Sequence, residues 1–396
     1  MTVFADEIGS QPIIHFDLSS AKPIYVNAST CLIVLWWTDC PVGQVDDVGI
    51  PGRALDQAKL MAAVPADILT RAKQIGENET ANRSCPAKTS VVICTRDRSD
   101  TLARCLASFS QQTLLPSQII VVDNASTDGR TCNVAQAAGA QYVREDRLGL
   151  DIARNVGARV ARGEIIAYTD DDVILHPRWL ERLVNAFDAP EVMAVTGLVL
   201  PAELETEAQR HFETYWGFGR GYRRKDFGTA FFSQDRKHGC RVWEIGAGAN
   251  MAFRREVFEF AGYFDERLDV GAAGCSGDSE YWHRVLTHGG ICRYEPSAVV
   301  FHYHRRDFPS LGNQIFNYMR GHTVALLVQF ERSGNFGNLR RAFFSMPGWY
   351  ARRLLRRMLK GPIERDRFFW REFTGFLSGL GYYFRYVGSS RLTNPK

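Results

Sequence analysis

Short apolar runs alternate with helix-like segments through about 220 residues in the middle of this chain. The apolar runs are bounded by turn residues and predict buried strands at 89–95, 118–124, 141–145, 164–172 and 192–200. Between them, apolar positions recur at helical spacing in 99–112, 131–139, 150–161 and 177–187. This alternation predicts an α/β fold, in which a mostly parallel sheet is flanked by helices on both faces.

The pattern differs on either side of this region. Residues 1–84 contain an apolar strand at 31–37 and a helical pattern at about 54–75 that is interrupted near Pro65. A polar stretch at 76–88 follows and is typical of a linker. We therefore expect a small, β-containing N-terminal accessory domain at 1–84, a central domain at 88–310, and a helical, basic C-terminal region at 311–396.

Polar side chains stand at the ends of three predicted strands. Thr95, Asp123 and the triplet Asp170–Asp172 all fall where ligands of such sheets bind. Three adjacent carboxylates repel one another unless a positive charge lies among them. A hard divalent cation, shared with substrate phosphates, would supply that charge. The alternative is a solvated turn that caps the helix after it.

The other strand ends are less specific. Asp123 opens a turn (NASTDG) and either shapes that turn or hydrogen-bonds a nucleobase or ribose. Thr95, Arg96 and Arg98 form a polar turn whose amides and guanidinium groups suit a diphosphate. The small residues of 246–250 (GAGAN) fit either a close approach to a ligand or backbone, or a plain tight turn.

Taken together, these motifs resemble a known family. VVICTRDR, IIVVDNASTDG and LGLDIARNVGARVARGEIIAYTDDDV are followed by WEIGAGANMAFRREVFEFAGYFDERL, GCSGDSEYWHRVLTHGG and AVVFHYHRR. Their order and spacing resemble an inverting family 2 glycosyltransferase with the GT-A (Rossmann-like) fold. The resemblance covers about residues 88–310.

The resemblance implies a donor site at the strand ends. Asp123 matches the aspartate that binds uracil, and Asp170 is expected nearer the ribose. Asp172 is expected to hold Mg²⁺ or Mn²⁺ together with His302, although His304 would face the same way on a strand. Asp171 is expected to be structural. The nucleotide-sugar contacts implied in this way are Thr95, Arg98, Asp123, Arg154 and Asp170.

The resemblance also implies a general base. Asp278 falls on the family's catalytic aspartate, and Glu280 is the fallback candidate. Gly277 stands where a glutamate is commoner, so the motif is imperfect. One metal-side group of acids and one separate base are sufficient for inverting transfer, because the metal stabilises the leaving diphosphate and the base deprotonates the acceptor hydroxyl.

The expected activity is transfer of a sugar from a nucleoside-diphosphate donor, expected to be UDP-linked, to a glycan or lipid-linked acceptor in cell-envelope or exopolysaccharide assembly. The rival hypothesis is a non-catalytic sugar-nucleotide-binding or scaffold protein that keeps the fold. A nucleotidyltransferase would need a glycine-rich loop after the first strand, and TRDRSDT contains no glycine.

Composition and charge bear on the binding partners and the cellular location of the chain. The chain is 45% hydrophobic with a net charge of +4, which demands no nucleic-acid partner. Its nine cysteines are scattered without a C-x-x-C pair, and neither a signal peptide nor a spanning segment is predicted, so a cytoplasmic location is expected. The basic helical stretch at 349–372 fits an anionic membrane surface, which we favour, or packing on its own domain.

Overall fold

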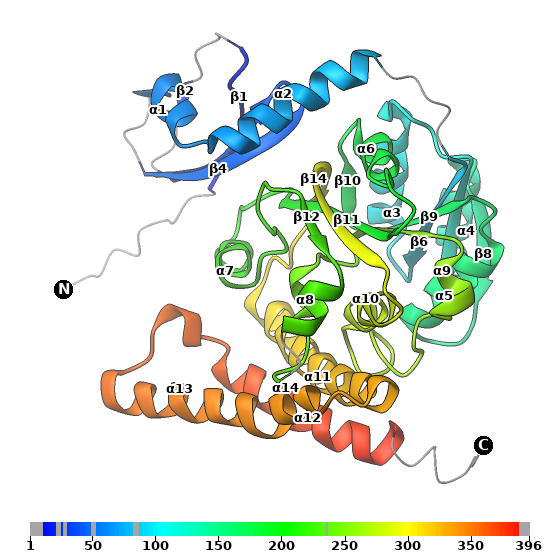
Figure 1. Cartoon of the computed structure of the whole chain (residues 1–396), viewed down its shortest axis with the longest axis vertical. Coiled ribbons are helices and arrows are strands. Elements are labelled where there is room, and N and C mark those ends of the chain that lie inside the picture. The colour runs from blue at the N-terminus through cyan, green and yellow to red at the C-terminus, as the bar shows by residue number, and fades with distance from the viewer. Residues whose placement is uncertain are drawn as a thin grey trace.

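A computed structural model of the chain describes residues 11–20, 25–26, 30–48, 53–81, 87–234 and 237–387. Figure 1 shows the small N-terminal β unit above the central sheet and a group of long helices below it. Among the described residues, no disulfide forms. No described helix is both long and apolar enough to cross a bilayer.

The central sheet has the strand order β10-β14-β11-β13-β9-β6-β7-β8, with β12 paired to β14. Strands β6, β7, β8 and β9 are parallel to one another. Strand β13 lies between β9 and β11 and is antiparallel to both. The sheet is therefore mixed, and the prediction of a mostly parallel sheet holds for its first half. The strands are β6 (Thr89–Thr95), β7 (Gln118–Asn124), β8 (Gln141–Glu145), β9 (Ile165–Asp170), β10 (Val173–Leu175), β11 (Val192–Pro201), β12 (Lys225–Phe227), β13 (Asn250–Arg254) and β14 (Ile291–His302).

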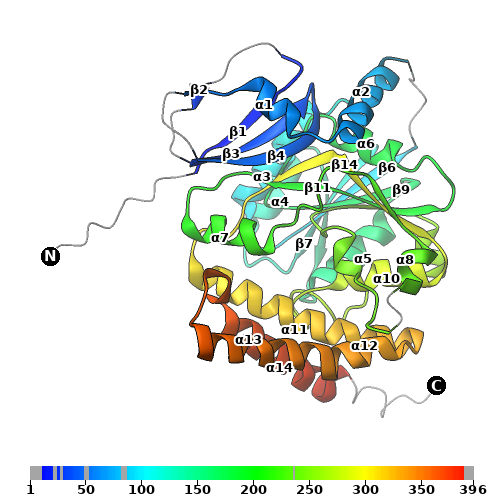
Figure 2. The ribbon, with the colours of Figure 1, turned by 60° about the vertical axis from the view of Figure 1, so that its left-hand side comes forward.

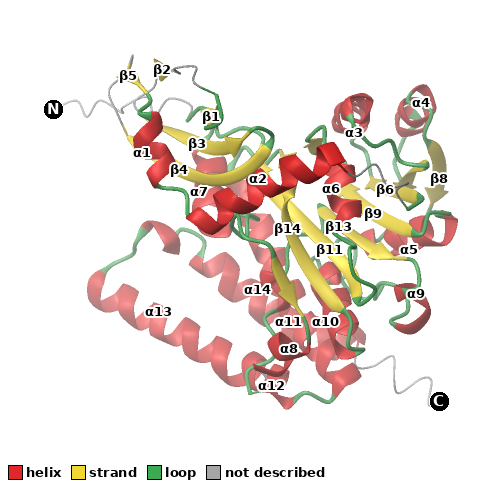
Figure 3. Ribbon diagram, turned by 45° about the horizontal axis from the view of Figure 1, so that its top comes forward, coloured by secondary structure: helices red, strands yellow, loops and turns green. Residues whose placement is uncertain are grey.

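Helices cover both faces of this sheet (Figure 3). One apolar core joins the sheet to α3 (Ser99–Ser108), α4 (Arg130–Ala137) and α6 (Trp179–Asn185). A second core joins its other face to α5 (Leu150–Val160), α9 (Val257–Phe260) and α10 (Gly277–Thr287). The predicted helix-covered α/β arrangement is confirmed, because each helix presents its apolar stripe to the sheet.

The N-terminal unit packs on the edge of the central sheet. Its strands β1 (Ile13–Asp17), β3 (Thr30–Trp37) and β4 (Cys40–Val48) form one sheet, and β2 (Tyr25–Val26) pairs with β5 (Arg53–Ala54). Arg182 of α6 donates to Asp39 at 2.6 Å, and Trp36 stacks on His176 with ring centroids 5.3 Å apart. Pro65 lies between α1 (Gln57–Ala62) and α2 (Ala66–Ala81). Because α2 continues to Ala81, the first part of the predicted linker at 76–88 is helical.

The C-terminal helices form a separate layer (Figure 2). They are α11 (Phe308–Ser333), α12 (Phe336–Arg340), α13 (Met346–Lys360) and α14 (Phe369–Tyr382). The side chain of Asp307 caps α11 by accepting from the Ser310 amide at 2.8 Å. Helix α11 lies between the sheet domain and α14, which it contacts through Leu326, Leu327 and Phe376. Two further helices, α7 (Glu207–Trp216) and α8 (Thr229–Gln234), flank β11 and β12.

Candidate active site

The three predicted strand ends meet at one edge of the sheet. Thr95 of β6 is paired with Asp123 of β7, and Cys94 is paired with Asp170 of β9. Parallel strands in register end at the same level, so the polar residues that follow them are brought together. This is the edge at which the sequence predicts a ligand.

Two carboxylates and an imidazole converge there. One ligand atom from each of Asp170, Asp172 and His302 lies within 4.8 Å of the others. Asp172 Oδ1 is 3.2 Å from His302 Nε2, because the β10–β14 ladder pairs Val173 with His302. Carboxylate-rich oxygen ligands suit Mg²⁺ and Mn²⁺, and one imidazole is compatible with both. The donor set therefore fits a divalent cation.

Charge in this group is incompletely balanced. Burial and the neighbouring Asp172 raise the pKa of Asp170 to about 6. His302 and Arg98 outweigh burial at Asp172 and hold its pKa well below the usual range, while Asp172 raises the pKa of His302. The raised pKa of Asp170 indicates that its negative charge is not fully balanced, and a bound cation would balance it.

Arg98 and Thr95 hold the middle acid. Thr95 Oγ1 donates to Asp171 at 2.6 Å, and Arg98 donates to both Asp171 and Asp172 at 3.0 Å. Asp171 is buried by these contacts. Thr95 and Arg98, which the resemblance assigned to the nucleotide, thus position the acids in this structure.

Asp123 is fully buried at the end of β7. Its Oδ1 accepts from the Ser126 amide at 2.9 Å, and its Oδ2 accepts from Tyr142 at 2.8 Å and Arg144 at 3.2 Å. The carboxylate therefore both shapes the NASTDG turn and stands among donors that order it at the strand edge.

His304 lies behind His302. The two Nδ1 atoms are 3.1 Å apart, and His304 Nε2 is 3.1 Å from a carboxylate oxygen of Glu213 on α7. Sequence spacing left both histidines open as ligands, whereas the structure brings only His302 within reach of the acids among its described residues. Glu213 was missed because it stands 91 positions from His304 in sequence.

Charged residues border the group formed by Asp170, Asp172 and His302, which we call the metal-side group. A cavity of about 500 Å³ opens beside Asp172. Its charged lining residues are four arginines (Arg98, Arg130, Arg305 and Arg306) and, besides Asp172, three aspartates (Asp97, Asp100 and Asp307). The charge of Arg305 lowers the pKa of Asp172. Arg130 and Arg305 were not predicted, although the HYHRR run at 302–306 contains Arg305. The combination of acids and guanidinium groups suits a metal-bound diphosphate.

Arg154 stands between this group and a second group of acids. Its Nη1 donates to Asp151 at 2.9 Å and to Asp269 at 2.7 Å, all three side chains being buried. Its charge lowers the pKa of both Asp170 and Asp278. The resemblance assigned Arg154 to the nucleotide, but its contacts in the structure are to carboxylates.

Asp278 is half-buried in the first turn of α10. Its Oδ1 accepts from the Ser279 amide at 2.6 Å. Burial raises the pKa of Asp278 and Asp269 raises it further, while Arg154 opposes both. A raised pKa on a carboxyl that is not fully buried suits a general base.

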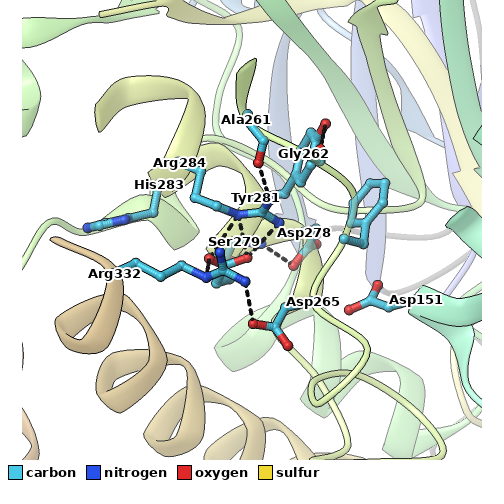
Figure 4. Close-up of polar contacts among 12 residues, drawn as sticks. Asp151, Ala261, Gly262, Asp265, Asp278, Ser279, Tyr281, His283, Arg284 and Arg332 are labelled. Carbon is cyan, nitrogen blue, oxygen red and sulfur yellow. Dashed lines mark hydrogen bonds and ion pairs between the residues drawn. The ribbon is translucent and has the colours of Figure 1, made fainter. Parts of the chain in front are cut away.

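Glu280 has a different environment. Its side chain has no exposed surface and is bound by Arg284 at 2.9 Å and by Arg332 of α11 at 3.2 Å. Figure 4 shows Arg284 and Arg332 close together, with Arg332 also paired to Asp265 at 2.8 Å. These contacts tie α10 to α11 and leave the fallback candidate enclosed, so the geometry favours Asp278 as the base.

The small residues of 246–250 have a steric cause. A Cβ at Gly246 would lie 2.5 Å from Thr196, and one at Gly248 would lie 2.8 Å from Arg154 Nη2 and 3.0 Å from Asp278 Oδ2. The structure shows close approach at this segment, although to side chains and not to another backbone, with Gly248 packed against Arg154 and Asp278.

Residues 90–260, which include most of the strands and helices described above, match the sequence model of the family described as glycosyl transferase family 2. These residues belong to that family. Together with the GT-A type sheet, the match identifies a glycosyltransferase domain and confirms the predicted family and enzyme class.

Among relatives of this glycosyltransferase, the glycosyltransferase AglE of Haloferax volcanii is 27% identical over 240 residues, which are 59% of this chain and 72% of AglE. The glucosyl-dolichyl phosphate glucuronosyltransferase of the same organism is 26% identical over 45% of this chain and 56% of its own length. A mannosyltransferase of Pyrobaculum calidifontis, solved with GDP-Man and Mn²⁺, is 18% identical with a TM-score of 0.49, covering 79% of this chain and 95% of its own.

Proposed function

We propose that the protein transfers a sugar from a nucleoside-diphosphate donor, UDP-linked in the first instance, to an acceptor hydroxyl with inversion. The observation that supports this most is the pairing of two unlike sites on one sheet edge. Asp170, Asp172 and His302 form a group suited to a metal ion, and Asp278, with its raised pKa, stands apart from it across Arg154.

We propose the following roles. Asp172 and His302 hold Mg²⁺ or Mn²⁺, and Asp170 lies nearer the ribose. When bound, the ion stabilises the charge that develops on the leaving diphosphate. Asp123 orders the uracil end of the site, while Arg98 and Arg305 bracket the diphosphate cavity. Asp278 takes the proton of the acceptor hydroxyl as it attacks the sugar on the face opposite the leaving group.

The test is donor-dependent stabilisation and turnover. Thermal shift with a set of nucleotide sugars, with and without Mn²⁺, identifies the donor, because a ligand that binds only the folded state raises its melting temperature. Release of UDP from the stabilising donor then measures chemistry. Asp172→Asn is the matched control and should lose the Mn²⁺-dependent shift. Stabilisation without any release would favour the rival hypothesis of a non-catalytic sugar-nucleotide-binding protein.

We further propose a lipid-linked acceptor at an anionic membrane surface on the cytoplasmic side, in cell-envelope or exopolysaccharide assembly. One relative is named as acting on glucosyl-dolichyl phosphate. In this chain, α13 exposes a row of apolar side chains, with Leu355, Met358 and Leu359 being 56%, 76% and 74% exposed. Exposed Arg352 and Lys360 flank this row.

The arginines of α13 are not all available to lipid headgroups, as the sequence pattern had suggested. Arg353 binds Asp366 and Glu372, and Arg356 also binds Asp366. These contacts hold α13 onto α14 and the segment before it, and the leucine and methionine row of α13 faces outward. The proposed surface therefore depends on apolar insertion more than on arginine.

Flotation of the whole protein with vesicles of phosphatidylglycerol and phosphatidylcholine tests this surface. Binding is expected, and replacing Leu355 and Met358 by serine should abolish it. Replacing Leu115 by serine, which is 68% exposed at a site remote from α13, is the matched control. Binding that survives loss of Leu355 and Met358, or no binding by the unaltered protein, contradicts the proposal.

A further inference from the structure

Asp151 is a buried acid with no task in the scheme above. It stands in the first turn of α5 and its side chain has no exposed surface. Its Oδ1 accepts from Arg154, and its Oδ2 has no hydrogen-bond partner among the described residues. A half-satisfied buried carboxyl is costly, so its presence beside the candidate base calls for a physical explanation.

The surrounding backbone brings Asp151 against α10. Gly271, with φ 94°, belongs to the loop that leads into α10. A Cβ at Gly271 would lie 2.8 Å from the Cα of Gly149. The Leu150 amide donates to the Val270 carbonyl at 2.9 Å. The loop before α10 therefore lies directly on the start of α5, because both glycines lack side chains.

Asp151 fills the space that a side chain at position 277 would need. Gly277 is the first residue of α10. A Cβ built there would lie 2.5 Å from Cγ of Asp151 and closer still to both of its oxygens. Nonbonded atoms do not approach this closely, so a side chain at 277 would force the Asp151 carboxylate out of the place that it holds on Arg154, and the two compete for one space.

We propose that Asp151 supplies, from α5, the acid beside Asp278 that position 277 lacks. It is a positioning residue: with Asp269 it holds Arg154, whose Nη2 lies with Asp278 Oδ2 around Gly248. Arg154 in turn keeps the Asp278 carboxyl directed at the site. Burial, Asp269 and Asp278 raise the pKa of Asp151, while Arg154 lowers it. This inference rests on the proposed function of Asp278.

Relocating the acid tests the proposal. Asp151→Ser should lower kcat for transfer by about 10- to 100-fold, the cost of a misplaced catalytic group, with KM for the donor little changed. Adding Gly277→Glu should restore most of kcat, whereas adding Gly277→Gln, of equal size but uncharged, should not. Equal rescue by both, or full activity of Asp151→Ser, would overturn the proposal.

A stability cycle tests the steric half independently of activity. Alanine at a helical position is normally preferred to glycine, yet Gly277→Ala alone should lower the melting temperature. In the Asp151→Ser background the same change should be neutral or stabilising. Additive effects would refute the competition for one space. Failure of the unaltered protein to transfer any sugar would instead sink the proposed function, while this cycle would still report on Asp151 and Gly277.

Discussion

The two groups of acids on either side of Arg154 differ in how their charge is balanced. At the strand ends, Arg98 binds Asp171 and Asp172, and the Asp170 carboxylate accepts no hydrogen bond from the residues that the structure describes. At the start of α10, Arg154 is built into the group and binds Asp151 and Asp269 directly.

This difference separates two chemical tasks. A group that lacks a cation of its own leaves coordination positions open, which suits a metal ion. A group with a built-in guanidinium needs no metal and can keep one carboxyl, that of Asp278, ready to take a proton. Glu280 is balanced still more fully, because Arg284 and Arg332 both bind it. Its enclosed carboxylate is therefore not available to take a proton from an acceptor.

Removing the base should separate the two groups most strongly. Asp278→Asn should lower the transfer rate by about 10²- to 10⁴-fold, because the acceptor hydroxyl loses its general base. Donor binding in the presence of Mn²⁺, measured by calorimetry, should be unchanged, since the metal-side group is intact. A near-normal rate would show that Asp278 is not the base.

Glu280 should act on stability and not on chemistry. Glu280→Gln removes the charge that balances the buried Arg284 and should cost about 3–5 kcal/mol of unfolding free energy. Urea unfolding measures this loss, and kcat of the folded fraction should stay close to normal. A stable Glu280→Gln variant with no activity would reverse the assignment of Asp278 and Glu280.

Substitution of His304, which contacts the proposed metal ligand His302, tests the metal-side group indirectly. Because His304 contacts His302 and Glu213 but is not grouped with Asp170 and Asp172, His304→Gln should weaken Mn²⁺ binding by about 10- to 100-fold without abolishing it. Titration of Mn²⁺ against donor-dependent stabilisation reads this out, with His302→Gln as the more severe comparison. Equal loss in both variants would place His304 among the ligands.

The smallest effect concerns pH. Asp278 works as a base only when deprotonated, so activity is present above its pKa and is lost as pH falls through it. Because burial raises this pKa, the acid limb of kcat should lie above the pH at which an ordinary aspartate titrates. Asp278→Glu should move the limb if this residue is responsible. A limb at the ordinary aspartate position would contradict the burial argument.

The strands and helices around the site follow closely from local pattern. The predicted ends of the strands at Thr95 and Asn124 were correct, and the third strand ends at Asp170, two residues before its predicted end. An apolar run and the polar residues that stop it are visible in consecutive residues. The antiparallel insertion of β13 between β9 and β11 was not predicted, since strand order depends on which segments pair and not on their composition. The inward orientation of Arg353 and Arg356 was missed for the same reason, because their partners Asp366 and Glu372 belong to a later segment.

By itself, the sequence determined the α/β architecture, the family and the identities of the acids at the two sites, because these depend on residue type and short-range spacing. Only the tertiary structure decided which acids remain available. Asp278 is accessible and Glu280 enclosed although they are two residues apart, since Arg332 reaches Glu280 from another helix. Likewise, Asp151 and Gly277 share one space although they are far apart in sequence. Coulomb and steric effects act over a few ångströms in space, and chain folding alone sets those distances.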